Sequence, residues 1–194
     1  MAVYTTIDNP SDYFNTLLYT ANNTGGTSIT GVGFQPGWTW IKGRSNNHHH
    51  ALFDAVRGVT KKIASSETNA ETTESTGLTS FNSDGFTTGA WSASNSNNQT
   101  YVAWNWLASN TTASNTDGSI TSTVSANTTS GFSIVSYTGN GAVTATVGHG
   151  LGVTPKMIIY KNLGNAYNWL VYHESLGNTH GMYLNATDAS VDNV

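Results

Sequence analysis

The residues with the most evident chemical potential are three consecutive histidines, His48-His49-His50. Imidazole nitrogens are good ligands for Zn, Ni and Cu. In an extended strand, however, successive side chains point to opposite faces, so three adjacent histidines seldom reach the same ion. The run therefore favours a polar loop end that leads into a strand, and no metal or other cofactor is expected. His48 and His49 remain candidates for surface contacts.

A second candidate site is the polar stretch WSASNSNNQT, residues 91–100, which carries one large aromatic side chain, Trp91. An indole ring can stack on a sugar while neighbouring amides, here those of Asn95 and Asn97, bond to its hydroxyl groups. Tryptophan is also enriched at subunit interfaces. The stretch therefore predicts a surface contact, either with a saccharide or with another subunit.

The sequence contains none of the common catalytic motifs, since a GxSxG elbow, an HExxH helix, a P-loop and a GxGxxG turn are all missing. Asp54 and Glu174 lie in corresponding regions of two repeats, so they cannot be assumed to approach to the roughly 5 to 10 Å that a glycosidase requires. Asp84 could help to bind Ca²⁺, but a hairpin turn through residues 82–85 explains it more simply. We expect that the chain is not an enzyme.

The elements that carry these residues belong to an internal repeat. When Pro36 is set against Pro155, 119 positions further on, residues 31–70 align with residues 150–189 without a gap. Upstream, residues 5–22 align with residues 123–140 at an offset of 118. The matched pairs include Gly31 with Gly150, Gly33 with Gly152, Lys42 with Lys161, Asn46 with Asn165, Gly58 with Gly177, Phe14 with Phe132 and Tyr19 with Tyr137. A period of this size is a whole domain.

The repeat predicts two tandem domains. The first is expected at residues 1–108, a Ser/Thr/Asn linker at 109–118, and the second at 119–194. The second domain is expected to be truncated at its C-terminus, because it lacks the equivalent of residues 76–108. We therefore expect it to have an open edge or to borrow strands from elsewhere.

Many short strands separated by Gly- and Asn-rich turns indicate an all-β fold made of two antiparallel β-sandwiches of jelly-roll type. Residues 65–76, with three glutamates and little apolar sequence, are expected to form an exposed loop. The aromatic and aliphatic positions expected in the core of the repeats are Phe14, Tyr19, Trp38, Trp40, Trp104, Trp106, Phe132, Tyr137, Ile159 and Trp169.

Composition excludes several classes of partner. Charged residues make up only 9% of the 194 residues and the net charge is −4, so there is no basic surface for nucleic acid. No apolar run approaches the roughly 20 residues of a membrane helix, so no membrane insertion is expected, and Met1-Ala2-Val3-Tyr4 does not begin a signal peptide. The chain contains 6 Trp, 9 Tyr and 6 Phe, which is 21 aromatic residues in all. This number argues for a folded chain.

Several long motifs resemble one known group of proteins. The segments GFQPGWTWIKGRS, LFDAVRG, GLTSFNSDGF, TYVAWNW, VGHGLGVTPKMIIYKN and NWLVYHESLG are similar to those of repeated virion structural proteins of tailed bacteriophages, particularly marine ones. Such proteins are usually described as tail-fibre-like. The resemblance implies concanavalin-like sandwich repeats and a protein of the virion, synthesised in the host cytoplasm.

The function that this resemblance implies is that of a tail fibre or tail-associated fibre contributing to host attachment. Its partners would be other virion proteins of the tail or capsid, further copies of itself in a homo-oligomer such as a trimer, and a glycan of the host cell surface. Two alternatives remain open. One is a capsid-decorating protein, acting as head fibre or cement, and the other is a carbohydrate-binding module.

Overall fold

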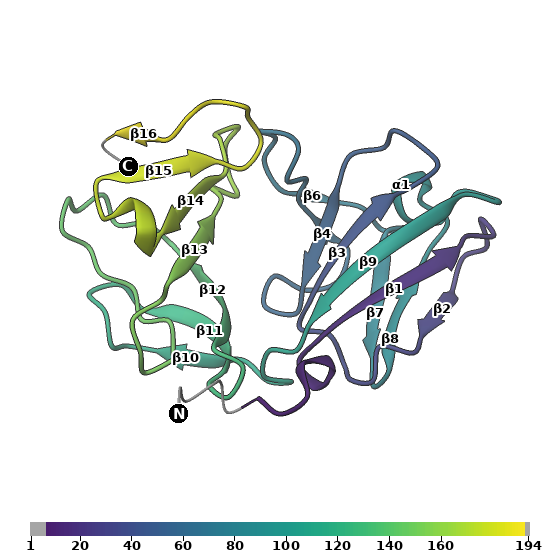
Figure 1. Cartoon of the computed structure of the whole chain (residues 1–194), viewed down its shortest axis with the longest axis horizontal. Coiled ribbons are helices and arrows are strands. Elements are labelled where there is room, and N and C mark those ends of the chain that lie inside the picture. The colour runs from purple at the N-terminus through teal and green to yellow at the C-terminus, as the bar shows by residue number, and fades with distance from the viewer. Residues whose placement is uncertain (1–6, 193–194) are drawn as a thin grey trace.

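The computed structural model describes residues 7–192, and most of its regular structure is β-strand in antiparallel sheets. The prediction of an all-β chain is confirmed. Figure 1 shows two halves side by side, an N-terminal half of residues 7–108 and a C-terminal half of residues 109–192. The outer domain limits, residues 1 and 194, lie outside the described residues. Within residues 7–192, no helix combines the length and the apolar character needed to cross a membrane.

The N-terminal half consists of two stacked antiparallel sheets (Figure 1). Its elements are η1 (Pro10–Asp12), β1 (Phe14–Thr20), β2 (Thr27–Thr30), β3 (Trp38–Gly43), β4 (Ala51–Asp54), β5 (Lys61–Lys62), β6 (Thr72–Thr73), β7 (Leu78–Asn82), β8 (Gly85–Thr88), α1 (Ser92–Asn95) and β9 (Thr100–Trp106). One sheet has the order β1-β9-β3-β4 and the other β2-β8-β7. The ribbon β5-β6 continues the first sheet through a bridge between Leu52 and Ile63.

The main core lies between these two sheets. In β3, Thr39 and Ile41 point inward and are buried, and in β9 Tyr101 and Ala103 do the same. The buried cluster consists of Ala21, Ile29, Ile41, Ala51, Phe53, Leu78, Phe86, Tyr101 and Ala103. Because side chains alternate along a strand, the tryptophans of β3 and β9 point to the other side of the same sheet.

This alternation corrects part of the expected core. Trp38, Trp40, Trp104 and Trp106 are only partly buried and lie outside the sandwich. Two of the other expected core residues are exposed at the surface, Phe14 by 38% and Tyr137 by 51%. Of the remaining residues expected in the core, Trp169 is buried, and Tyr19, Phe132 and Ile159 are partly buried. The sequence showed two apolar faces on these strands but not which one faces inward.

The C-terminal half contains two further antiparallel sheets, of order β10-β11-β12 and β13-β14-β15-β16. Its elements are β10 (Ala113–Asn115), β11 (Ser122–Asn127), β12 (Phe132–Tyr137), β13 (Met157–Tyr160), β14 (Leu170–His173), η2 (Glu174–Leu176), β15 (His180–Tyr183) and β16 (Val191–Asp192). Strand β10 lies within residues 109–118, which were expected to be a linker. This segment is instead an edge strand of the first of these sheets.

The strand pairings of β13 to β16 repeat those of β3 to β6 at the offset of 119 residues. Trp38 pairs with Asp54 as Met157 pairs with His173. Further along, the pairs Leu52–Ile63 and Lys61–Thr73 correspond to Val171–Met182 and His180–Asp192. Local contacts repeat as well, since the Nζ atoms of Lys42 and Lys161 each donate to two carbonyl oxygens at corresponding positions.

The two halves meet through a segment expected to be an exposed loop, residues 65–76. The indole Nε1 of Trp169 donates to the carbonyl oxygens of Ala64, at 2.9 Å, and Glu67, at 3.1 Å. The Glu71 amide donates to the Leu163 carbonyl oxygen at 2.9 Å. A small buried cluster of Leu52, Ile63 and Trp169 adds apolar contact. The expectation of a simple exposed loop is therefore corrected.

Candidate functional site

An array of aromatic side chains covers the outer face of the sheet β1-β9-β3. Trp106 of β9 lies between Phe14 of β1 and Trp38 of β3 in the antiparallel register. In the next row on the same face, Trp104 lies opposite Trp40. We call these five residues, Phe14, Trp38, Trp40, Trp104 and Trp106, the aromatic platform. The strand alternation that buries the inner face of the sheet necessarily places all five together on the outer one.

The rings of the aromatic platform are in mutual contact. Trp38 and Trp106 are stacked with their centroids 4.5 Å apart, and Phe14 packs on Trp106 at 4.8 Å. Trp40 meets Trp104 edge to face at 6.1 Å. Phe132 of the C-terminal half stacks on Trp38 at 5.8 Å and so covers one end of the platform. The other end, around Trp40 and Trp104, is not covered in this way.

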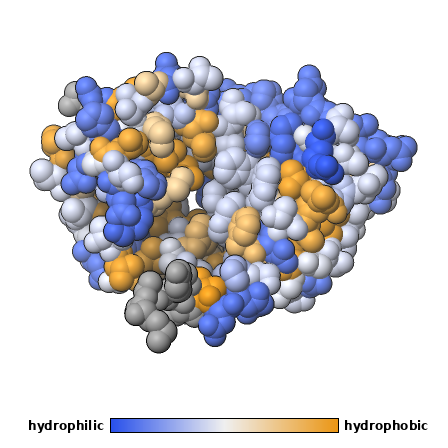
Figure 2. Space-filling model, in the orientation of Figure 1, coloured by the Kyte–Doolittle hydropathy of each residue, from blue (hydrophilic) through white to orange (hydrophobic). Residues whose placement is uncertain are grey.

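A cavity of about 310 Å³ opens at this uncovered end, lined by Phe14, Trp40, His50, Trp104 and Trp106. This volume is at the lower limit of typical small-molecule sites. Figure 2 shows the molecule hollowed between its two halves, with hydrophobic residues at the edge of the hollow. The cavity therefore has aromatic walls, and the imidazole of His50 is its one strongly polar ring.

The imidazole of His50 in the cavity wall is held in a defined orientation. The indole Nε1 of Trp40 donates to Nδ1 of His50 at 2.7 Å. Burial lowers the pKa of His50 from its ordinary value, and Lys42 and His49 lower it further. At neutral pH the ring is therefore uncharged, and because Nδ1 accepts a hydrogen bond, the proton lies on Nε2.

The residues expected as contacts in the 91–100 stretch lie elsewhere. Trp91 is partly buried against the main core, on the opposite side of the sheet from the aromatic platform. Its ring meets Phe53 edge to face at 6.3 Å, and the Nζ of Lys62 lies 5.3 Å from its centroid. Asn97 is exposed. Trp91 therefore contributes to packing rather than offering a free stacking face.

The structure corrects the expectation that Asn95 lies at the surface. Its side chain is fully buried, and its Nδ2 donates to the carbonyl oxygens of Gly89, at 2.8 Å, and Thr24, at 2.9 Å. Its Oδ1 accepts from the Asn22 amide at 3.1 Å. The amide group thus satisfies backbone atoms of neighbouring loops, which is a structural role.

The other two expected contacts belong to the histidine run. His48 is partly buried and His49 is exposed. The Nε2 of His49 lies 2.9 Å from a carboxylate oxygen of Glu67. Within residues 7–192, His, Cys, Asp and Glu side chains form no group of three or more that could hold a metal ion. His50, the member of the run that lines the cavity, was not singled out because its bond to Trp40 depends on strand pairing.

Asp84 binds the backbone of a neighbouring turn. Its two carboxylate oxygens accept hydrogen bonds from the amides of Gly31, at 3.0 Å, and Gly33, at 2.6 Å. Both glycines have positive φ, 96° and 88°, so their amides converge into an anion-binding nest. These two hydrogen bonds lower the pKa of Asp84 below its ordinary value of 3.8.

We expect Asp84→Asn to lower the melting temperature near neutral pH, because the amide binds the two glycine N–H groups less strongly. A depressed carboxyl pKa contributes stability above the ordinary pKa, and this contribution disappears as the pH falls through the depressed value. Thermal melts across the acid range should therefore show the two proteins converging at low pH. A constant difference at all pH values would contradict this assignment.

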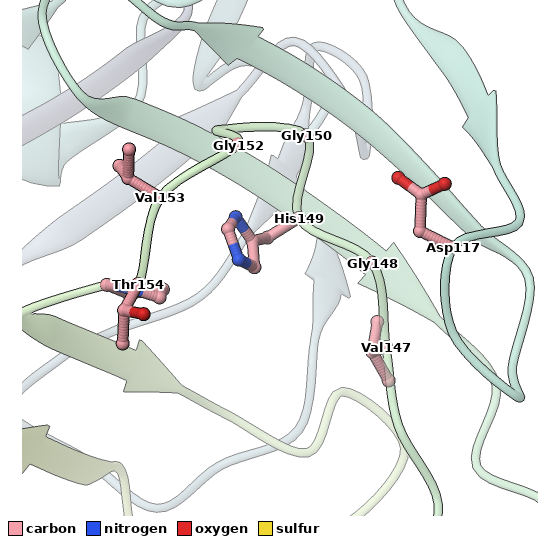
Figure 3. Close-up of a pocket in the computed structure, with 9 residues that line it drawn as sticks. Asp117, Val147, Gly148, His149, Gly150, Gly152, Val153 and Thr154 are labelled. Atoms are coloured by element: carbon pink, nitrogen blue, oxygen red, sulfur yellow. The ribbon is translucent and has the colours of Figure 1, made fainter.

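A second, larger cavity of about 660 Å³ lies in the C-terminal half. Figure 3 shows the loop of residues 147–154 curving around the ring of His149, with Asp117 on a neighbouring segment. The Nδ1 of His149 accepts the amide of Leu151 at 3.2 Å, so this imidazole is engaged within its own loop. Gly150 and Gly152, which line the cavity, are the repeat partners of Gly31 and Gly33 and share their positive φ, at 75° and 71°.

Comparison with known proteins places the chain in a family but not with a characterised relative. No curated protein and no solved structure matches it. The model of the family described as "Domain of unknown function (DUF7483)" matches residues 9–194, so the chain belongs to that family.

Proposed function

We propose that the chain is a non-catalytic binding module that holds a saccharide on the aromatic platform. The observation that carries this proposal is the cavity at the uncovered end of the platform, which is lined by the aromatic rings of Phe14, Trp40, Trp104 and Trp106 together with His50. Aromatic faces bind the apolar C–H surface of a pyranose. The ligand expected here is a neutral oligosaccharide.

The resemblance to repeated virion proteins supplies the biological setting of this proposal. A fibre or tail-associated protein that contributes to host attachment needs a site for a surface glycan, and the aromatic platform offers one. In this setting the chain occurs in the virion, together with further copies of itself and other tail proteins. The capsid-decorating alternative uses the same module at another place. Immunogold electron microscopy of the particles would separate the two, because the label would lie on the tail in one case and on the head in the other.

The finer architecture that we propose is a tandem pair of concanavalin-like sandwiches. Its support is the repeated register of β3 to β6 in β13 to β16, together with the glycines of positive φ at the same repeat positions. In this arrangement the two halves turn equivalent sheet faces toward each other, since Leu52 and Val171 are repeat partners and both are buried. The cavity on the aromatic platform belongs to the N-terminal repeat, which supplies all of its lining residues.

Trp104→Ala is expected to weaken saccharide binding by at least about tenfold, since it removes one of the two rings at the uncovered end of the platform. A panel of neutral oligosaccharides on an array would identify a ligand, and isothermal titration would measure the change in Kd. Trp104→Phe keeps an aromatic face and should retain most of the affinity.

Tyr167→Ala is the matched control, because Tyr167 is an aromatic side chain of the C-terminal half that is 62% exposed and does not line the cavity. It should bind like the parent. The proposal fails if no neutral saccharide binds the parent, or if Trp104→Ala and Tyr167→Ala bind equally well while both remain folded.

A further inference from the structure

The C-terminal half leaves open a position that a strand fills in the N-terminal half. There, β9 lies between β1 and β3 and pairs with both along its length. The repeat partners of β1 and β3 are β12 and β13, and these two strands belong to separate sheets. Within the described residues, no strand lies between them. Each is the edge strand of its own sheet, so within the described residues one side of each strand carries backbone groups without a ladder partner.

The face of β13 that would point into a core is also uncovered. Ile158 and Tyr160 are the repeat partners of Thr39 and Ile41, which are fully buried between the sheets of the N-terminal half. In β13 these side chains are 42% and 43% exposed. The N-terminal half covers the equivalent face with β7 and β8, so the C-terminal half lacks a covering layer as well as a central strand.

The third vacant position in the C-terminal half is its counterpart of the glycine nest, at Gly150 and Gly152. In the N-terminal half, the turn between β7 and β8 places the Asp84 carboxylate on the amides of Gly31 and Gly33. The corresponding amides of Gly150 and Gly152 donate to no acceptor within residues 7–192. They line the 660 Å³ cavity of Figure 3, where the turn of a hairpin would lie.

We propose that the C-terminal half binds a polypeptide segment of the same pattern as residues 78–106, which completes its sandwich. The segment begins with a β-hairpin whose turn carries an aspartate, and this carboxylate enters the nest at Gly150 and Gly152. It ends with a strand that inserts between β12 and β13, antiparallel to both. In that strand, small or aromatic apolar residues alternate with residues that face outward, as Tyr101 and Ala103 do in β9.

The three vacancies together favour this occupant over a second copy of the chain. Edge pairing with another copy would satisfy one strand edge, but it would leave the nest and the exposed face of β13 empty. A second copy also cannot lend its own residues 78–106 without losing its main core, because Leu78, Phe86 and Tyr101 are fully buried there. The proposal does not rest on saccharide binding, which concerns the sheet β1-β9-β3-β4 of the N-terminal half.

The experiment is to append a second copy of residues 76–108 directly after Val194 and to compare the extended chain with the parent by hydrogen exchange. Covalent attachment keeps the segment at high effective concentration. Amides of β12 and β13 should exchange at least about tenfold more slowly in the extended chain. The amides of Gly150 and Gly152 should become protected at the same time.

Two control chains separate insertion from a general effect of extra sequence. Asp84→Asn in the appended copy should reduce protection at Gly150 and Gly152 more than at β12. Tyr101→Asp with Ala103→Asp in the appended copy should abolish protection of β12 and β13, because charged residues cannot enter the core. Equal exchange in parent and extended chains would overturn the proposal. So would a parent chain that already protects β12 and β13 as a dimer, since a second copy would then be the occupant.

Discussion

Arg57→Ala is expected to lower the free energy of unfolding by about 3–5 kcal/mol, the largest single effect that we expect in this chain. The guanidinium is 7% exposed and forms an ion pair between its Nε and the carboxylate of Asp54. Its Nη1 donates to Glu71 at 3.0 Å and to the Lys61 carbonyl at 2.9 Å. Removing the side chain leaves the Asp54 carboxylate, 8% exposed, without its cation. Urea denaturation followed by circular dichroism would measure the change.

Two variants test whether the geometry of the guanidinium matters. Arg57→Lys keeps the charge but cannot reach several partners at once, so it should fall between the parent and Arg57→Ala. Lys156→Ala breaks an exposed pair with Glu174 and should lower the free energy of unfolding much less than Arg57→Ala does. If Arg57→Ala were no more destabilising than Lys156→Ala, the buried network would not have the role that its contacts indicate.

The same substitution has a consequence for the contact between the two halves. Glu71, which Arg57 holds, donates its amide to Leu163 of the C-terminal half. The segment around it also accepts the indole N–H of Trp169. We therefore expect Arg57→Ala to loosen the contact between halves before global unfolding. The amide of Glu71 should therefore exchange with solvent faster in Arg57→Ala than in the parent.

The internal repeat could be read from the sequence because glycines with positive φ and the strands between them recur at a constant spacing. Gly31 and Gly33 match Gly150 and Gly152 in both sequence and backbone conformation. Conformations of this kind favour glycine strongly, so their pattern is visible without a structure. The all-β character follows from the same turn chemistry.

The position of the aromatic platform could not be read in the same way. In β3 the residues Trp38 and Trp40 alternate with Thr39 and Ile41, and both sets are compatible with a core. Only the pairing with β9 and the covering sheet β2-β8-β7 decides that the smaller residues point inward. The tryptophans are then left on the outer face of the sheet, where Trp38 and Trp40 pack against the small cluster of Leu52, Ile63 and Trp169 instead of the main core.

The prediction of surface contacts by Trp91 and Asn95, in residues 91–100, failed for a related reason. A Ser/Asn-rich segment with one tryptophan has the composition of an exposed loop, yet this one is drawn inward by hydrogen bonds to distant residues. The hydroxyl of Tyr101 donates to the Ser92 carbonyl at 2.6 Å, and that of Tyr19 donates to the Ser94 carbonyl at 2.8 Å. Such long-range bonds depend on the fold and leave no periodic signal in the sequence.

Asn95→Ala is therefore expected to destabilise the protein by about 3 kcal/mol, although the residue lies in a polar loop. The substitution leaves the buried carbonyl oxygens of Thr24 and Gly89 without the Nδ2 donor, and the Asn22 amide without its acceptor. Each buried polar group left unpaired costs about 1–3 kcal/mol, and entry of water offsets part of the sum. Urea denaturation of the variant would measure the difference.

Asn97→Ala is the matched control, two residues further along the same loop and exposed. It should change the free energy of unfolding by no more than about 0.5 kcal/mol. Asn95→Asp distinguishes the two functions of the amide, because it keeps an acceptor for Asn22 but presents a carboxylate to two carbonyl oxygens. It should therefore be at least as destabilising as Asn95→Ala. Equal stability of the Asn95 and Asn97 variants would instead mean that contacts other than the Asn95 amide hold the loop, such as those of Tyr19 and Tyr101.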